Sequence, residues 1–208
     1  MYPMLRIPLK APVTRAITPL CRIALRIGLT PNQVTVMGTI GVAVSSLFFY
    51  PRGDLFIGTL VITFFVLTDL FDGTMARLSN KGPSNWGALL DATMDRISDA
   101  AIICGLLLFT IKKGSLSTES ILLAISLVAG FLVSYIKAKA ESLDIECEGG
   151  FAERTERLII VLVSAGLAGL DVPNALLIGF ALLSFVSVIT VFQRLLIVFR
   201  SHNSHERY

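Results

Sequence analysis

Apolar residues dominate the chain in blocks that are long enough to cross a membrane. A transmembrane helix needs ~20 consecutive and mainly apolar residues to span the hydrocarbon core of a bilayer. Blocks of this kind occur at residues 32–50, 54–78, 87–111, 118–140, 156–172 and 174–199. The pattern therefore predicts an all-α integral membrane protein with six transmembrane helices, built as a single domain over residues 1–208.

The two ends of the chain have a different pattern. Residues 1–30 interleave basic and apolar positions along "LRIPLKAPVTRAITPLCRIALRIGL", which predicts an amphipathic interfacial helix and argues against a cleavable signal peptide. Pro8, Pro12 and Pro19 are expected to break this helix. At the other end, the polar run "SHNSHERY" at residues 201–208 predicts a flexible tail.

Composition agrees with a location in the bilayer. Hydrophobic residues make up 54% of the chain and charged residues 16%, with a mean hydropathy of +0.75, so a soluble domain could not bury the apolar surface. The basic residues are more informative than the net charge of +3, because they gather at cytoplasmic ends of membrane helices. With the N-terminus in the cytoplasm, that side holds Arg6, Lys10, Arg15, Arg22, Arg26, Arg77, Lys81, Lys137, Lys139, Arg154, Arg157, Arg194, Arg200 and Arg207, and the opposite side holds Arg52, Lys112 and Lys113. We therefore expect a multi-pass plasma-membrane protein with both termini in the cytoplasm and no nucleic-acid partner.

Aspartates recur at helical spacing where two of the predicted helices meet. Asp69 and Asp72 share one stripe in "VLTDLFDGTMARL", and Asp91, Asp95 and Asp99 recur every four residues in "WGALLDATMDRISDA". A Gly-Pro turn signal between the two helices predicts that they are antiparallel neighbours. The two stripes can then face each other near the cytoplasmic end of the bundle.

Carboxylates in such numbers need a partner. Each charge in a membrane helix costs at least ~2.5 kcal/mol, and neighbouring carboxylates either raise one another's pKa or need a cation. Oxygen ligands favour Mg²⁺, Mn²⁺ or Ca²⁺ over zinc, and paired metals suit phosphoryl chemistry. Two alternatives remain: internal pairing with Arg77 and Arg96, or a proton or cation pathway through the bundle. Cys21, Cys104 and Cys147 lie far apart in the sequence and suggest neither a disulfide nor a zinc site.

Glycines beside the acids favour phosphoryl transfer over a pathway. Gly73 and Gly87 leave the helix surfaces bare, so that a nucleotide or a diphosphate can approach closely. Arg77, one turn after Gly73, can neutralise phosphate oxygens.

These residues resemble the signature of the CDP-alcohol phosphatidyltransferase family. The signature reads D, two residues, DG, two residues, AR, a gap, G, three residues, D, three residues, D. Its fixed positions are filled by Asp69, Asp72, Gly73, Ala76, Arg77, Gly87, Asp91 and Asp95. The gap holds nine residues where the commonest form has eight. The stretch "LTPNQVT" at residues 29–35 resembles the one that precedes the first transmembrane helix in many members and helps to hold the cytidine. Further stretches, "PLKAPVTR", "PRGDLF", "SYIKAKAES" and "ERTERL", resemble the actinobacterial phosphatidylinositol-phosphate synthase branch.

The resemblance implies transfer of the phosphatidyl group from CDP-diacylglycerol to a phosphorylated polyol such as inositol 1-phosphate, with release of CMP. It implies two Mg²⁺ ions, with Mn²⁺ as an alternative, and a homodimer. Asp95 would be the general base as well as a metal ligand. The implied metal ligands are Asp69, Asp72, Asp91 and Asp95. The implied CDP-diacylglycerol site consists of Asn32, Gln33, Val34, Thr35, Gly73, Ala76, Arg77 and the loop residues Pro83 and Ser84.

A second set of basic residues follows in the later helices. Arg194 lies inside the last predicted helix, where a charge needs a partner or a wet pocket. Several fixed cations would suit the phosphate of an acceptor, and the candidates are Lys137, Arg154, Arg157 and Arg194. Positive-inside placement alone is the simpler explanation. Inositol 1-phosphate and glycerol 3-phosphate both fit such a site, so a phosphatidylglycerophosphate synthase is the alternative enzyme and an ion-coupled transporter the non-enzyme alternative.

Overall fold

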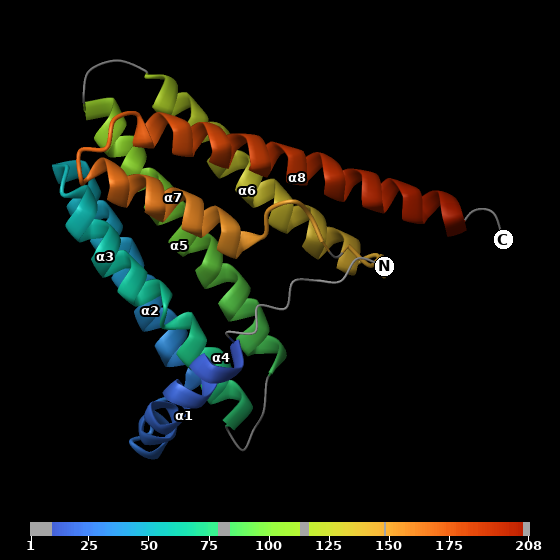
Figure 1. Ribbon diagram of the computed structural model, residues 1–208. Coiled ribbons are helices and arrows are strands. Elements are labelled where there is room, and N and C mark those ends of the chain that lie inside the picture. The colour runs from blue at the N-terminus through green and yellow to red at the C-terminus, as the bar shows by residue number, and fades with distance from the viewer. Residues whose placement is uncertain (1–9, 79–83, 113–116, 148, 206–208) are drawn as a thin grey trace. The chain divides into compact units, whose positions relative to one another are not determined.

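The computed structural model describes residues 10–78, 84–112, 117–147 and 149–205, without the side chains of 10–16, 69–70, 112 and 202–205. Over these ranges the chain is helical and forms no strand, which confirms the all-α prediction (Figure 1). The helices are α1 (Lys10–Arg26), α2 (Pro31–Phe49), the short 3₁₀ helix η1 (Tyr50–Arg52), α3 (Leu55–Val66), α4 (Asp69–Leu78), α5 (Asn85–Lys112), α6 (Thr118–Glu141), α7 (Arg154–Ala168) and α8 (Ala175–His205).

Two compact units make up the chain. The first comprises Met1–Ala43 and Ile62–Ser98, and so holds α1, α4, most of α2 and the first half of α5. The second comprises Val44–Val61 and Asp99–Tyr208, with most of α3, the rest of α5 and all of α6, α7 and α8. Each contact below lies within one unit. The single-domain interpretation stays a prediction.

Helix α1 packs on α4 in the first unit. It runs without interruption from Lys10 to Arg26, through Pro12 and Pro19, so the expected breaks at these two prolines are wrong, and Pro8 lies outside the described residues. Pro12 lies in the first turn, where its missing N–H would have no helical partner, whereas Pro19 lacks an interior N–H bond and its ring crowds the carbonyl four residues earlier, a cost that the contact with α4 can offset. Within that contact the fully buried Cys21 thiol donates to the Phe71 carbonyl at 3.7 Å, and burial raises the pKa of this thiol.

A capping box sets the start of α2. The Thr30 hydroxyl accepts from the Gln33 backbone N–H at 3.3 Å, and the Gln33 side-chain oxygen accepts from the Thr30 N–H at 2.9 Å. Pro31, as the first helical residue, has no N–H that would need a partner. The sequence "TPNQ" therefore fixes the beginning of a helix whose observed bounds differ from the predicted 32–50 by one residue at each end.

The predicted helix 54–78 is divided into α3 and α4 at Leu67 and Thr68. The Thr68 hydroxyl donates to the Phe65 carbonyl at 2.6 Å, a local bond that competes with the regular helical ladder. A new helix N-terminus begins at Asp69 as a result. The first turn of α4 therefore carries both Asp69 and Asp72, where the helix dipole favours negative charge.

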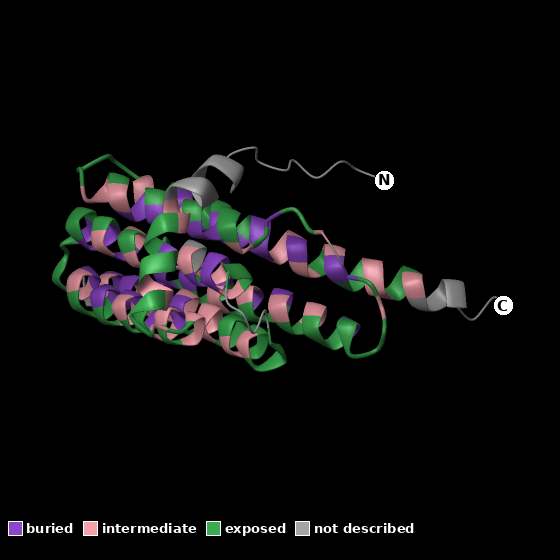
Figure 2. Cartoon of the chain, turned by 90° about the horizontal axis from the view of Figure 1, so that it is seen from below, coloured by how far each residue is buried: buried purple, intermediate pink, exposed green. Residues whose placement is uncertain are grey.

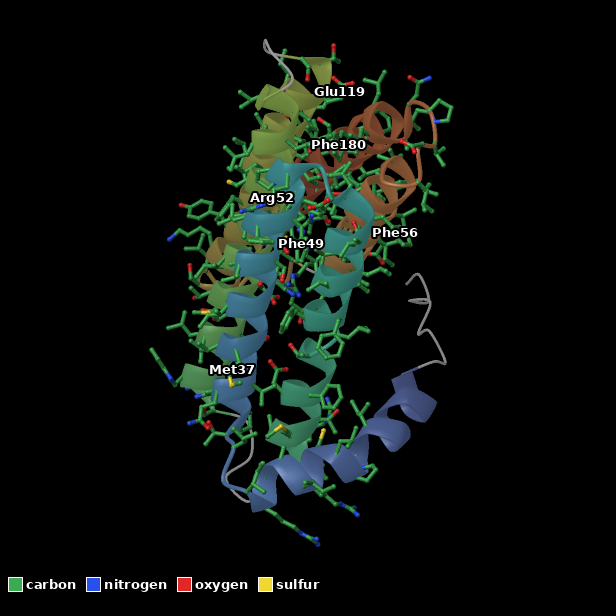
Figure 3. The ribbon with its side chains drawn as sticks, turned by 90° about the vertical axis from the view of Figure 1, so that its left-hand side faces the viewer. Met37, Phe49, Arg52, Phe56, Glu119 and Phe180 are labelled. Atoms are coloured by element: carbon green, nitrogen blue, oxygen red, sulfur yellow. The ribbon has the colours of Figure 1, made fainter. Side chains whose placement is uncertain are left out.

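Small residues allow close packing in the second unit, where α6 and α7 both lie against α8 (Figure 1). A Cβ at Gly105 of α5 would lie 2.5 Å from the Ser46 carbonyl oxygen. Gly179 of α8 similarly faces Ser164 of α7, so both contacts depend on a missing side chain. Buried and exposed positions alternate along the helices (Figure 2), and Figure 3 shows Phe49 and Phe56 on either side of the η1 turn.

Four described helical stretches are long and apolar enough to cross a membrane: Pro31–Arg52, Leu55–Leu78, Thr118–Glu141 and Ala175–Ser201. The other two predicted spans correspond to α5 and α7. Helix α5 has 28 residues, but its first half carries several charges, and α7 has only 15 residues where 156–172 was predicted. Helix α8 continues to His205, into the stretch that was predicted to be a flexible tail.

Candidate functional site

Asp72 on α4 is held by Thr35 on α2. The Thr35 hydroxyl donates to Asp72 Oδ2 at 2.6 Å, and both side chains are buried, with Asp72 only 6% exposed. The same threonine oxygen lies 3.1 Å from the Pro31 carbonyl. Thr35 was predicted as a nucleotide contact, and the structure gives it a further task, because it fixes the orientation of a predicted metal ligand.

The carboxylates of α5 are more open than Asp72. Asp91 is exposed and Asp95 is half-buried, with Asp95 Oδ2 3.9 Å from an Arg96 Nη atom. This contact is the kind of internal pairing that was the alternative to a metal site, but at 3.9 Å it is at the limit of an ion pair. Asp69 is the first residue of α4, and its side chain is among those that the structure does not describe.

Whether the acids share a metal ion stays a prediction. Among the described side chains, no three His, Cys, Asp or Glu residues form a group that could hold one. The donor set nevertheless fits a hard divalent cation in kind, because two aspartates open α4 and two lie one turn apart on α5. Helix surface beside Asp72 adds room for such an ion, since a Cβ on Gly73 would meet no described atom within 4 Å beyond its chain neighbours and its own helix's backbone.

The start of α5 lies beside the start of α2. Ser84 Oγ accepts from the Gly87 N–H at 3.0 Å and so caps α5, and Asn32 Oδ1 lies 3.4 Å from the position of a Cβ on Gly87. The structure thus brings Asn32 close to Ser84 and Gly87, which lie 52 and 55 positions further along the chain. Gln33 instead completes the capping box of α2, and Pro83 lies outside the described residues.

Three further predicted nucleotide contacts lie on these helices. Val34 is half-buried in the first turn of α2, and Ala76 is half-buried on α4. Arg77 is exposed in the last turn of α4, and its Nη2 donates to Thr74 Oγ1 at 3.2 Å. The Arg77 guanidinium is therefore oriented from its own helix and remains at the protein surface.

Gly73→Ala tests whether the open surface of α4 serves a ligand. We expect the melting temperature to stay at the wild-type value, because a Cβ there meets no described atom within 4 Å apart from the backbone of its own helix and its chain neighbours. CDP-diacylglycerol affinity should fall by roughly 5- to 150-fold, from a steric cost of ~1–3 kcal/mol. Gly130→Ala on α6 is the matched control, since its Cβ also has open space, and it should change neither quantity. Unchanged affinity in Gly73→Ala would show that no ligand approaches α4 there.

Arg194 connects three segments of the second unit. Its Nη1 donates to the Val133 carbonyl of α6 at 2.7 Å, and its Nε donates to the Gly149 carbonyl at 3.3 Å. The residue is only 6% exposed. A buried charge inside α8 was expected to need a partner, and these two backbone carbonyls are partners of that kind. The two bonds use two of the five guanidinium N–H groups, so phosphate binding is compatible with them.

The other predicted acceptor residues lie in the same unit. Arg157 is buried on α7, and its Nη1 donates to the Ala152 carbonyl at 3.2 Å. Arg154, the first residue of α7, donates through Nε to Asp99 Oδ1 at 3.2 Å. Lys137 on α6 is more open, and its Nζ lies 3.8 Å from Glu141 Oε1. Each of these basic side chains has a partner within the described chain.

Sequence reasoning missed the residues that hold the connection before α7. Thr190 Oγ1 accepts from the Ala152 N–H at 3.1 Å, and Gln193 Oε1 accepts from the Phe151 N–H at 2.7 Å. Both come from α8, one turn apart, so α8 fastens the backbone that leads into Arg154. No motif marks them. Asp99 did carry a signal, because it continues the four-residue spacing of Asp91 and Asp95.

The sequence model of one family matches most of the chain. This family is described as CDP-alcohol phosphatidyltransferase, and the match covers residues 28–192. Phosphatidylinositol phosphate synthase of Mycobacterium tuberculosis is 45% identical over 204 residues, covering 95% of this chain and 92% of the relative. The protein of the same name from Streptomyces avermitilis is 43% identical over 197 residues, covering 90% of this chain and 79% of the relative.

Solved structures of the Mycobacterium tuberculosis synthase share the fold. The crystal structure with CDP-DAG bound superposes with a TM-score of 0.86 at 46% identity, covering 90% of this chain and 95% of that one. The crystal structure in complex with manganese and citrate has a TM-score of 0.83 at 47% identity, covering 88% and 89%.

Proposed function

This chain belongs to the CDP-alcohol phosphatidyltransferase family, and we propose that it transfers the phosphatidyl group of CDP-diacylglycerol to inositol 1-phosphate. The products are phosphatidylinositol phosphate and CMP. The observation that carries the proposal is the complete eight-position signature from Asp69 to Asp95, in a chain 45% identical to a phosphatidylinositol phosphate synthase. An ion-coupled transporter would need no Gly73, Ala76 and Arg77 at these offsets.

The reaction breaks the phosphoanhydride bond of CDP-diacylglycerol and forms a phosphoester bond to the acceptor. An acceptor hydroxyl oxygen attacks the phosphorus that carries diacylglycerol, the bond from this phosphorus to the CMP oxygen breaks, and CMP leaves with the electron pair. Asp95 takes the proton of the hydroxyl, and general-base catalysis of this kind contributes roughly 10²–10⁴ in rate. The half-buried carboxylate of Asp95 is suitable for this task, because water-borne acceptor can reach it.

The nucleotide end of CDP-diacylglycerol would bind at the first unit. Asn32 and Ser84 meet at the starts of α2 and α5, Gly73 leaves room beside α4, and Arg77 presents its guanidinium at the surface. Diacylglycerol would stay in the leaflet. The Mycobacterium tuberculosis synthase has been crystallised with CDP-DAG bound, which supports CDP-diacylglycerol as the donor substrate.

A divalent metal would be held by Asp69, Asp72, Asp91 and Asp95. When bound, such ions neutralise the diphosphate and the charge that develops on the leaving group. We propose two Mg²⁺ ions, with Mn²⁺ as the alternative, and the manganese complex of the Mycobacterium tuberculosis synthase supports divalent-metal binding. Thr35 keeps the Asp72 carboxylate oriented through its 2.6 Å hydrogen bond.

The acceptor phosphate would bind in the second unit at the four basic residues Lys137, Arg154, Arg157 and Arg194. Guanidinium groups match phosphate oxygens with paired N–H donors, and two of these arginines lie in the first turn of α7, whose N-terminus attracts anions. The names of the relatives favour inositol 1-phosphate over glycerol 3-phosphate as the acceptor.

We further propose six membrane spans in the plasma membrane, with α5 and α7 completing the four apolar stretches, and with both termini and the active site in the cytoplasm. Helix α1 would lie at the interface, since Leu20, Ile23 and Ile27 are exposed beside the basic residues Arg22 and Arg26. The family resemblance implies a homodimer.

An acceptor panel tests the proposed function. With purified protein, Mg²⁺ and CDP-diacylglycerol, kcat/KM for inositol 1-phosphate should exceed that for free inositol by at least ~10², because two charge-assisted hydrogen bonds contribute ~1.5–3 kcal/mol each. Glycerol 3-phosphate should fall between the two. Preference for free inositol would contradict the phosphate site, and preference for glycerol 3-phosphate would support a phosphatidylglycerophosphate synthase.

A further inference from the structure

Asp99 makes a contact that the proposed chemistry does not use. Its Oδ1 accepts from Arg154 Nε at 3.2 Å, which joins the middle of α5 to the first residue of α7, 55 positions further along the chain. Both side chains are half-buried, with 20% of the Asp99 side chain and 22% of the Arg154 side chain exposed. An ion pair at this depth is screened less by water and salt than a surface pair.

Arg154 stands where a cation is electrostatically unfavourable. The N-terminus of a helix carries a positive partial charge, and Arg157, one turn later on α7, adds a further cation. Without an anion nearby, both effects would push the Arg154 guanidinium away from the start of α7. Glu153 at the N-cap and Glu156 in the first turn are acidic residues of α7 itself, and the Asp99 carboxylate of α5 contacts the guanidinium directly, through Nε at 3.2 Å.

A second acid-base pair in the same unit provides a contrast. Lys137 and Glu141 lie one turn apart on α6, with 3.8 Å between Nζ and Oε1 and exposed fractions of 45% and 61%. Exposed pairs of this kind contribute little, because water and salt screen them. Of the two pairs, only Asp99–Arg154 connects different helices at a short distance.

We propose that Asp99 is a positioning residue, which holds the Arg154 guanidinium ready for the acceptor phosphate. This inference rests on the proposed function, in which Arg154 binds that phosphate. Arginine loses much conformational freedom when it binds a ligand, and a partner that orders the side chain beforehand removes this cost from binding. Asp99 therefore raises acceptor affinity without contacting the acceptor.

The test measures KM for inositol 1-phosphate at saturating CDP-diacylglycerol and Mg²⁺. Asp99→Ala should raise this KM roughly fivefold, the effect of leaving one rotamer-rich side chain unordered, with kcat and the KM for CDP-diacylglycerol unchanged. Asp99→Asn keeps a side-chain oxygen that can accept from Nε, so its acceptor KM should stay nearer to the wild type. Glu119→Ala, in the first turn of α6 and so at the opposite end of that helix from Lys137, is the control and should leave the acceptor KM unchanged.

A double mutant separates this inference from the proposed function. Arg154→Gln should raise the acceptor KM by itself, and adding Asp99→Ala should cause no further rise, because Asp99 acts through Arg154. An Arg154→Gln protein with wild-type acceptor KM would overturn the proposed phosphate site. If Arg154→Gln raises the KM but Asp99→Ala does not, or if the two effects add, only the role of Asp99 is wrong.

Discussion

The Asp95→Asn protein is expected to bind CDP-diacylglycerol within about tenfold of the wild type and to lose phosphatidyl transfer. Asparagine has nearly the same shape as aspartate but cannot take a proton from the acceptor hydroxyl. Loss of a general base lowers kcat by roughly 10²–10⁴, and loss of a metal ligand adds to this. The measurement is CMP release at saturating substrates, together with nucleotide binding at equilibrium.

Asp144→Asn is the matched control for this substitution. Asp144 is exposed and has a φ of 56°, a left-handed conformation that asparagine adopts as readily as aspartate. Its turnover should equal that of the wild type. Comparable turnover in Asp95→Asn and Asp144→Asn would remove Asp95 from the role of general base.

Asp72→Asn should remove most of the dependence of nucleotide binding on Mg²⁺. The amide oxygen can still accept the 2.6 Å hydrogen bond from Thr35, so the packing of α2 and α4 is retained while the negative charge is lost. We expect kcat/KM to fall by ~10³, because a divalent ion contributes several kcal/mol to transition-state stabilisation. Titrating CDP-diacylglycerol binding with and without Mg²⁺ isolates the effect on binding.

Asp69→Asn and Asp91→Asn should behave in the same way as Asp72→Asn. Asp171→Asn is the control, since Asp171 is exposed, distant in sequence from the signature and left-handed at φ 58°. The contrary result is that Mg²⁺ increases CDP-diacylglycerol affinity as much in the Asp72→Asn, Asp69→Asn and Asp91→Asn proteins as it does in the wild type. That result would show that these carboxylates do not hold the metal.

The sequence predicted the long helices well because their signals are continuous. The observed α6, Thr118–Glu141, exceeds the predicted 118–140 by one residue, and the capping box "TPNQ" explains the start of α2. Such elements depend on local chemistry, namely an apolar run between polar ends. The signature likewise identified the family, because its residue types occur at fixed offsets.

Elements that depend on tertiary contacts were predicted less well. Helix α7 ends at Ala168, four residues before the predicted end, where the chain turns through Asp171 in the left-handed conformation. Hydropathy does not register such a turn, because apolar residues continue through it. Helix α1 also passes through Pro19, since its contact with α4 outweighs the local preference of a single residue.

The candidate site shows the same division. Residue type and spacing identified Arg194 as a charge in need of partners, but those partners are the backbone carbonyls of Val133 and Gly149, which leave no trace in a sequence. Gln33 was assigned to the nucleotide, although its side-chain oxygen serves the helix cap. Asp99 lay on a recognised stripe, yet only the folded chain links it to Arg154.

The fate of the acceptor phosphate tests the central claim most directly. Purified protein would be incubated with Mg²⁺, CDP-diacylglycerol and inositol 1-phosphate that is labelled in its phosphate, and the lipid extract would be analysed together with the released nucleotide. We predict that the label enters the lipid, in a product that retains the inositol phosphate, with one CMP released for each labelled lipid and none without a divalent metal. Label that stays in the aqueous phase while CMP is released, or no CMP release with any phosphorylated acceptor, would contradict the account.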